Sequence, residues 1–156
     1  MAGAEDVLCI DQNAGALERL KRNAERNGVA GKVRVERGNA MQLLRTLTSE
    51  EKRFDQVICD PPAFARNKRE ADGARRGYVE LNRRAIDLTV PGGSIVSASC
   101  SHNVGADDFI KMISKAAHGA GRDVWLEELK KASPDHPHLV TLPETDYLKR
   151  AFLRVS

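Results

Sequence analysis

A short loop combines a carboxylate, two prolines and an aromatic ring, residue types that together could hold a flat polar ligand. The loop, Asp60-Pro61-Pro62-Ala63-Phe64, follows the apolar run 57–59, a pattern typical of a buried strand. Each proline fixes its own φ and lacks an N–H donor, so the loop cannot wind into a helix. Ligands bind at the carboxyl ends of strands in open α/β sheets. We therefore predict a site here for an amino-bearing planar ligand such as a nucleobase.

A cysteine in the segment Ser99-Cys100-Ser101-His102 could act as a nucleophile. Of the three cysteines, Cys100 is the one placed in a polar loop directly after a strand-like run. A thiolate attacks electrophilic carbons well, and His102 could help to form it. The alternative is a half-buried thiol without a chemical role. Spacing alone favours that alternative, because short motifs often match by chance.

Two further polar residues are predicted at the ends of earlier strands. Asp11 closes the apolar run 7–11, where an acid commonly binds the ribose hydroxyls of a nucleotide. An acid near a helix N-terminus is an equally good interpretation of Asp11. Asn39 follows the next strand and could contact an adenine amino group or simply form a turn.

These residues are expected at the strand ends of a chain that alternates strands and helices. The expected strands are 7–11, 33–36, 54–60, 94–98 and 124–129, with a final pair at 139–142 and 151–155. The expected helices are 14–27, 41–47, 75–89 and 107–118, and Pro91-Gly92-Gly93 should end the third and turn into the next strand. This order predicts an α/β, Rossmann-like, mostly parallel sheet with an antiparallel C-terminal edge.

Length and charge permit an anionic partner without requiring one. The 156 residues suit one domain, and 25 basic side chains face 22 acidic ones. Basic residues concentrate between Arg66 and Arg84, directly after the Asp60 loop. A solvated helix face explains this segment slightly better than a binding surface on charge density alone.

The remaining patterns argue against other classes of protein. Three cysteines do not form a disulfide framework, and Cys9 and Cys59 are expected to be small core residues. His136 and His138 lack further ligands at metal-binding spacing, so we expect solvated imidazoles and no metal. The chain shows no signal peptide and no apolar run of about 20 residues, so a cytoplasmic protein is expected.

Taken together, these motifs resemble the class I S-adenosylmethionine-dependent methyltransferases. The closer similarity is to the ribosomal RNA large-subunit methyltransferases that modify cytosine C5, which usually carry an N-terminal PUA domain. The resemblance is carried by the segments 7–11, 54–64, 91–93, 99–101, 135–137 and 143–149. It implies S-adenosylmethionine as cofactor and large-subunit ribosomal RNA as partner, and it leaves a homodimer open.

The resemblance also assigns roles to individual residues. It implies that Cys100 is the nucleophile and that Asp60 assists it. Implied cofactor-binding residues are Asp11, Gln12, Asn39, Ala40, Asp60 and Pro61. Implied substrate-binding residues are Pro62, Phe64, Lys68 and Ser101, with the ring of Phe64 stacked on the target base.

The family chemistry explains why a cysteine would be needed. Cytosine C5 is a poor nucleophile, and addition of a thiolate at C6 makes it enamine-like. Two alternatives remain open from the sequence. One is methylation of a guanine nitrogen, which needs no thiol, and the other is an inactive RNA-binding remnant that keeps the basic segment.

The chain departs from the family pattern at its start. The family fold begins with a strand and a Gly-rich loop that approaches the cofactor, and neither is found before Val7. We expect residues 1–156 to be a single, N-terminally truncated methyltransferase domain that lacks this strand, this loop and the PUA domain.

Overall fold

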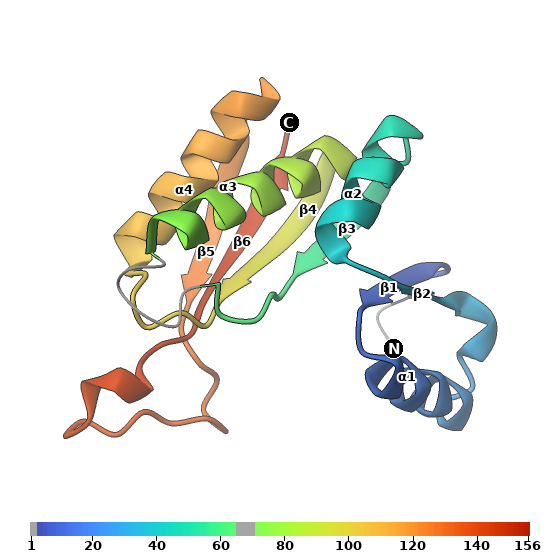
Figure 1. Ribbon diagram of the computed structural model, residues 1–156, viewed down its shortest axis with the longest axis horizontal. Coiled ribbons are helices and arrows are strands. Elements are labelled where there is room, and N and C mark those ends of the chain that lie inside the picture. Colours follow the sequence, from blue (N-terminus) through green and yellow to red (C-terminus); the bar gives the residue numbers. More distant parts are fainter. Residues whose placement is uncertain (1–2, 65–70) are drawn as a thin grey trace. The chain divides into compact units, whose positions relative to one another are not determined.

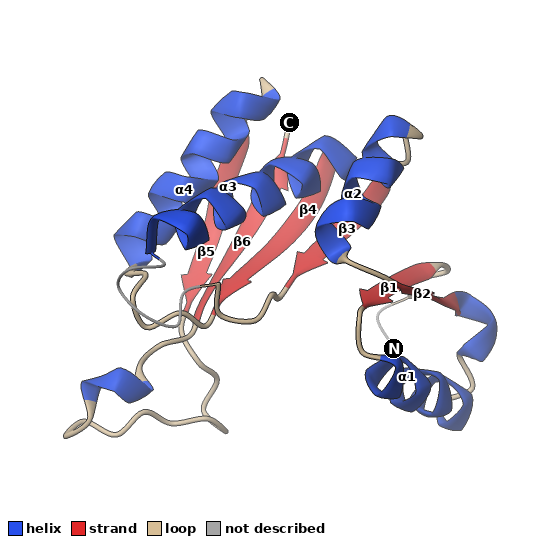
Figure 2. Cartoon of the chain, viewed as in Figure 1, coloured by secondary structure: helices blue, strands red, loops and turns tan. Residues whose placement is uncertain are grey.

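The computed structural model describes residues 3–64 and 71–156. The chain divides into two compact units, Met1–Leu47 and Thr48–Ser156, which are described separately below. Figure 1 labels the helices and strands, and Figure 2 distinguishes them by colour. The assignment of residues 1–156 to one domain stays a prediction.

The first unit is built around two parallel strands. Strands β1 (Val7–Asp11) and β2 (Val33–Arg37) pair in parallel from Val7↔Val33 to Asp11↔Arg37. They are joined by helix α1 (Ala14–Arg26) and a short 3-10 helix η1 (Ala30–Lys32). Helix α2 (Ala40–Ser49) begins in this unit. The predicted cap of α1 is confirmed, because the side chain of Asn13 accepts a hydrogen bond from the Ala16 amide.

The second unit contains a four-stranded sheet with the order β3-β4-β6-β5. Its strands are β3 (Phe54–Cys59), β4 (Thr89–Ser99), β5 (Val124–Lys130) and β6 (Lys149–Val155). Strands β3 and β4 are parallel, whereas β6 runs antiparallel to both β4 and β5. The predicted α/β architecture, with parallel strand pairs and an antiparallel C-terminal edge, is therefore confirmed.

Two helices cover one face of this sheet (Figure 1). They are α3 (Ala71–Leu88), which connects β3 to β4, and α4 (Ala106–Ala120), which connects β4 to β5. The core between helices and sheet includes the buried side chains of Tyr78, Ile95 and Phe109. Because β3 and β4 are parallel, both helices begin at the carboxyl edge of these two strands.

The Pro91-Gly92-Gly93 segment does not form the predicted turn before a strand. It lies inside β4, where the register against β3 shifts between Phe54 and Gln56. Gly92 has a φ of 78°, and a Cβ on Gly93 would lie 2.9 Å from the Asp55 carbonyl oxygen. Glycines are needed here because the two backbones approach closely at an irregular, bulge-like pairing.

The predicted strand at 139–142 is also wrong. These residues form a turn in which the Leu142 amide donates to the Leu139 carbonyl, and Val140 is 84 % exposed. Strand β6 lies between β4 and β5, so both of its edges are already paired. A 3-10 helix, η3 (Pro143–Thr145), follows the turn. None of the helices in the described part of the chain is long and apolar enough to cross a membrane.

Candidate active site

The Asp60 loop and the Cys100 loop meet at the carboxyl edge of β3 and β4. The two strands are parallel neighbours in which Cys59 pairs with Ser97, so the residues that follow them lie at the same edge. The thiol Sγ of Cys100 lies 3.8 Å from the Pro61 carbonyl oxygen, to which it donates a weak hydrogen bond. Cys100 is half-buried and Asp60 is exposed. The structure thus brings together the two loops that carry the predicted catalytic residues, through a contact between residues 39 positions apart in the chain.

The serines on either side of Cys100 are anchored to a buried tyrosine. The Ser99 hydroxyl donates to the Tyr78 hydroxyl at 2.9 Å, and the Tyr78 and Ser101 hydroxyl oxygens lie 3.0 Å apart. All three side chains are fully buried. The Ser101 hydroxyl belongs to this internal network, and a role of Ser101 in substrate binding stays a prediction. The network fixes the backbone on both sides of the half-buried thiol.

A buried lysine supports the same loop from strand β6. The Lys149 side chain is largely buried, and Nζ donates to the carbonyl oxygens of Ser101 at 2.8 Å and Val104 at 2.6 Å. Burial lowers the pKa of Lys149, while the nearby Cys100 and Asp146 act in the opposite direction. Lys149 therefore ties down the loop that carries Cys100.

The sequence interpretation missed Lys149, although a signal for it exists. Lys149 shares the inward-facing parity of β6 with Ala151, Leu153 and Val155, and all three of these are buried. A lysine at the inward position of an otherwise apolar alternation needs an internal partner. Here those partners are the two carbonyl oxygens of the Cys100 loop.

Within the first unit, the predicted cofactor-binding residues gather at the carboxyl ends of β1 and β2. The Gly38 amide donates to the Asp11 carbonyl and so joins the ends of the two strands. The carboxylate of Asp11 is exposed and accepts from the Asn13 amide at 2.7 Å through Oδ1. Asn39 caps α2, because its Oδ1 accepts from the Gln42 amide at 3.2 Å. Each residue therefore uses one oxygen for local structure.

Gln12 is next to Asp11 in the chain and Ala40 is next to Asn39, so both lie near the carboxyl ends of β1 and β2. Gln12 follows β1 directly, and its carbonyl accepts from Arg37 Nε at 3.3 Å. Ala40 is the first residue of α2. Lys68 lies outside the described residues.

Comparison with known proteins identifies relatives of this chain. A family described as conserved hypothetical protein 95 matches residues 2–72. Ribosomal RNA large subunit methyltransferase I of Serratia proteamaculans is 40 % identical over 99 % of the chain. The enzyme of the same name from Klebsiella pneumoniae is 39 % identical. The chain spans about two fifths of the length of these relatives, 39 % in both cases.

Solved structures show which fold this is. SMU.776, assigned as a methyltransferase and complexed with SAH, matches 99 % of the chain with a TM-score of 0.83 and 20 % identity, over 40 % of its own length. NSun6 from Pyrococcus horikoshii with SFG matches 96 % of the chain with a TM-score of 0.67 and 19 % identity, over 41 % of its length. The chain has the class I methyltransferase fold. In sequence it is related to ribosomal RNA large subunit methyltransferase I.

In this methyltransferase fold, Phe64 packs beside the cysteine loop. Its ring meets the Tyr78 ring edge-on, with centroids 4.7 Å apart and planes at 71°, and it lies over Gly77. Phe64 is half-buried, whereas Pro62 is exposed. The stacking of Phe64 on a base stays a prediction, and Tyr78 adds a second role by supporting both Phe64 and the serines.

His102 contacts an aromatic ring, and its predicted assistance to Cys100 stays a prediction. Its ring lies 4.9 Å from the ring of Tyr147, whose hydroxyl is 2.9 Å from Nε2 of His136. His136 is therefore hydrogen-bonded rather than only solvated. Within residues 3–64 and 71–156, no three His, Cys, Asp or Glu side chains gather closely enough to hold a metal ion.

Proposed function

We propose that this chain is the methyl-transferring part of an enzyme that methylates C5 of a cytosine in large-subunit ribosomal RNA. The methyl donor would be S-adenosylmethionine. The observation that carries the proposal is the 3.8 Å contact between the thiol of Cys100 and the Pro61 carbonyl of the Asp60 loop. The kinship with ribosomal RNA large subunit methyltransferase I and the fold shared with the SAH complex of SMU.776 support it.

The first unit fits the nucleoside half of this cofactor. Asp11 keeps Oδ2 available for ribose hydroxyls, because only Oδ1 accepts from Asn13. Asn39 uses its carbonyl oxygen as a helix cap, so we expect its amide group to donate to a ring nitrogen of adenine. Gln12 and Ala40 would flank the adenine. The bound cofactor supplies an electrophilic methyl group on a sulfonium ion.

The second unit would act on the base. The Cys100 thiolate forms a bond to C6 of cytosine, and the electron pair of the C5–C6 double bond shifts toward N3, which makes C5 nucleophilic. Exposed Asp60 would accept a hydrogen bond from the exocyclic amino group and orient the ring. When C5 takes the methyl group, S-adenosylhomocysteine would be the leaving group. A base would then remove the C5 proton, so that the C5–C6 double bond re-forms and the thiolate leaves. Pro62 and Phe64 would contact the base, which must be unstacked to reach the thiol.

Methylation of a guanine nitrogen is a second candidate reaction, because it too could use the Asp60 loop. That reaction needs an acid–proline loop to orient an amino group but no nucleophilic thiol. The structure offers one discriminating feature, the thiol itself. Its removal should abolish cytosine methylation and leave guanine methylation largely intact.

The test compares Cys100→Ala with Cys9→Ala in the purified protein. Cys9 is a half-buried cysteine in the other unit and serves as the matched control. We expect methyl transfer from S-adenosylmethionine to ribosomal RNA to fall at least about 1,000-fold in Cys100→Ala only. RNA containing 5-fluorocytidine should trap a covalent protein–RNA adduct, because C5 then carries no proton to lose. Undiminished methyl transfer by Cys100→Ala would refute the covalent mechanism.

A further inference from the structure

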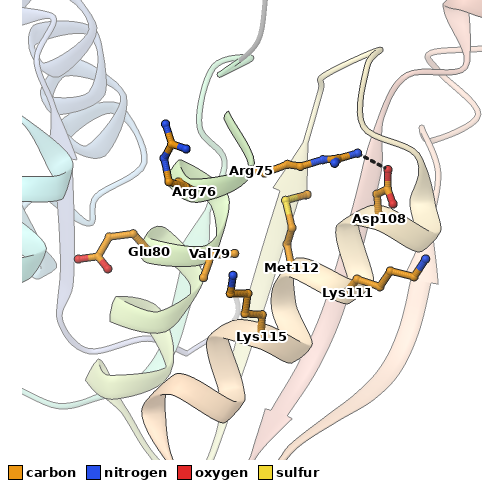
Figure 3. A pocket seen from close by; sticks show the side chains of 8 residues that line it. All are labelled: Arg75, Arg76, Val79, Glu80, Asp108, Lys111, Met112 and Lys115. Atoms are coloured by element: carbon orange, nitrogen blue, oxygen red, sulfur yellow. Dashed lines mark hydrogen bonds and ion pairs between the residues drawn. The ribbon is translucent and has the colours of Figure 1, made fainter. Parts of the chain in front are cut away.

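A hollow with a basic lining lies between helices α3 and α4. Its volume is about 350 Å³, and Figure 3 shows the side chains that line it. The basic members are Arg75 and Arg76 from α3 with Lys111 and Lys115 from α4. We refer to this surface as the α3–α4 groove. It lies outside the loops that carry Asp60 and Cys100.

Positive charge dominates the α3–α4 groove. Two acids also line it, but each has a partner: Asp108 bonds Arg75 across the groove at 3.0 Å, and Glu80 bonds Arg84 at 3.0 Å. In residues 3–64 and 73–156, no acid lies within ion-pair distance of Arg76, Lys111 or Lys115. Three exposed cations thus remain for an anionic ligand.

The basic segment predicted from the sequence splits into two parts in the structure. Arg83 and Arg84 form ion pairs with Asp87, and Arg84 also pairs with Glu80, all on α3 itself. These arginines follow the expectation of a solvated helix face. Arg76 instead joins the two lysines of α4, which the sequence places far from it. This anion-binding surface therefore forms only when α3 and α4 pack side by side.

The spacing of the groove suits a chain of phosphates. Lys111 and Lys115 are one turn apart on α4, about 6 Å along the helix axis, and so project from the same side. Val79 and Met112 form an apolar floor between the cations. A ribose–phosphate backbone presents regularly spaced charges joined by less polar sugars. A lone metabolite phosphate would need only one of these cations.

The position of the groove connects it to the candidate active site. Helix α4 begins at Ala106, shortly after Cys100, and α3 follows the loop that begins at Asp60. Both helices start at the carboxyl edge of β3 and β4, so the end marked by the Arg75–Asp108 pair lies toward that edge (Figure 3). The lysines lie farther along α4, away from the edge. A strand of RNA that leaves the site can continue over them.

We propose that the α3–α4 groove binds the sugar–phosphate backbone of the substrate RNA next to the target nucleotide. This inference rests on the proposed function for the identity of the ligand. The contacts are to phosphates, so they hold the RNA in register and carry no sequence information themselves. Arg76, Lys111 and Lys115 are therefore positioning residues rather than catalytic ones.

The test removes two groove charges and two charges elsewhere. Lys111→Gln/Lys115→Gln is compared with Lys32→Gln/Lys52→Gln, which changes the net charge equally at exposed lysines outside the groove. Binding of a fluorescent ribosomal RNA fragment is measured over a range of salt concentrations. For single-stranded contacts, the slope of log K against log salt should become shallower by about 1.4 in the groove variant, ~0.7 for each lost phosphate. The control variant should keep the wild-type slope.

Steady-state kinetics separate this proposal from the proposed function. We expect the groove variant to raise KM for RNA and to leave kcat unchanged, because no groove residue touches the reacting atoms. If methyl transfer is absent but the groove variant still loses its salt slope, the proposed function fails and the RNA site stands. If methyl transfer occurs and both double variants keep the same slope and KM, the groove proposal is overturned. The proposal would also be overturned if Lys111 and Lys115 were needed to bind a poly-glutamate peptide but not to bind RNA.

Discussion

Replacing Lys149 with methionine should destabilise the folded state. The substitution keeps a long unbranched side chain but removes two hydrogen bonds, from Nζ to the carbonyl oxygens of Ser101 and Val104. A hydrogen bond from a charged group contributes about 1.5–3 kcal/mol, so the two lost bonds amount to roughly 3–6 kcal/mol before any compensation.

Part of that loss is recovered because methionine has no charge to desolvate. Burial is the largest influence on the pKa of Lys149 and lowers it, which shows that enclosing the ammonium group is itself unfavourable. The Ser101 carbonyl also keeps a second donor, the Val104 amide at 3.3 Å. We therefore expect a net destabilisation of ~2 kcal/mol for Lys149→Met.

Urea unfolding measures this loss of stability. The midpoint should fall without a change in the denaturant slope, and Lys130→Met, at an exposed lysine paired with Glu128, should change stability by less than about 0.5 kcal/mol.

Wild-type stability in Lys149→Met would refute the reasoning, because it would mean that the two hydrogen bonds from Nζ contribute nothing to the folded state.

Two further substitutions test the surroundings of the site. Tyr78→Phe removes the hydroxyl that contacts the buried hydroxyls of Ser99 and Ser101, so the free energy of unfolding in urea should fall by about 1–3 kcal/mol. Tyr147→Phe, which loses an exposed hydrogen bond, should reduce it less, and equal losses would contradict a special role for the buried network. Burial raises the pKa of Cys59 to about 12 from 9.0, so the folded state keeps a thiol proton that the unfolded state loses. Stability should therefore fall between pH 9.0 and about 12 by up to ~1.4 kcal/mol per pH unit, and Cys59→Ala should remove this part of the fall; an identical pH dependence in both proteins would exclude it.

Local signals were enough for the elements whose causes lie within a few residues. The cap at Asn13 and the glycine that follows helix α1 predicted that helix, and the apolar run before Asp60 predicted β3. The meeting of the Asp60 and Cys100 loops followed from one topological rule, that parallel strands share a carboxyl edge. These predictions needed no knowledge of how distant segments pack.

The errors arose where a distant segment decides the conformation. Pro91-Gly92-Gly93 is a turn signal by itself, but the backbone of Asp55 approaches it so closely that it serves an irregular strand pairing. The apolar run at 139–142 has strand-like composition, yet β6 already has partners on both edges. Neither fact is visible within a short window of sequence.

The same distinction explains why the support of Cys100 was missed while Cys100 itself was found. A reactive thiol is recognised by its own type and its polar neighbours. A supporting residue leaves a weaker signal, because its role depends on what it touches. Tyr78 lies on α3 and Lys149 on β6, and they reach the Cys100 loop through the packing of helix and sheet. A thiolate that adds to a base must stay fixed while the base enters and leaves. The fully buried hydroxyls of Ser99 and Ser101 hold the backbone on both sides of Cys100, and they leave its half-buried thiol positioned to meet a substrate.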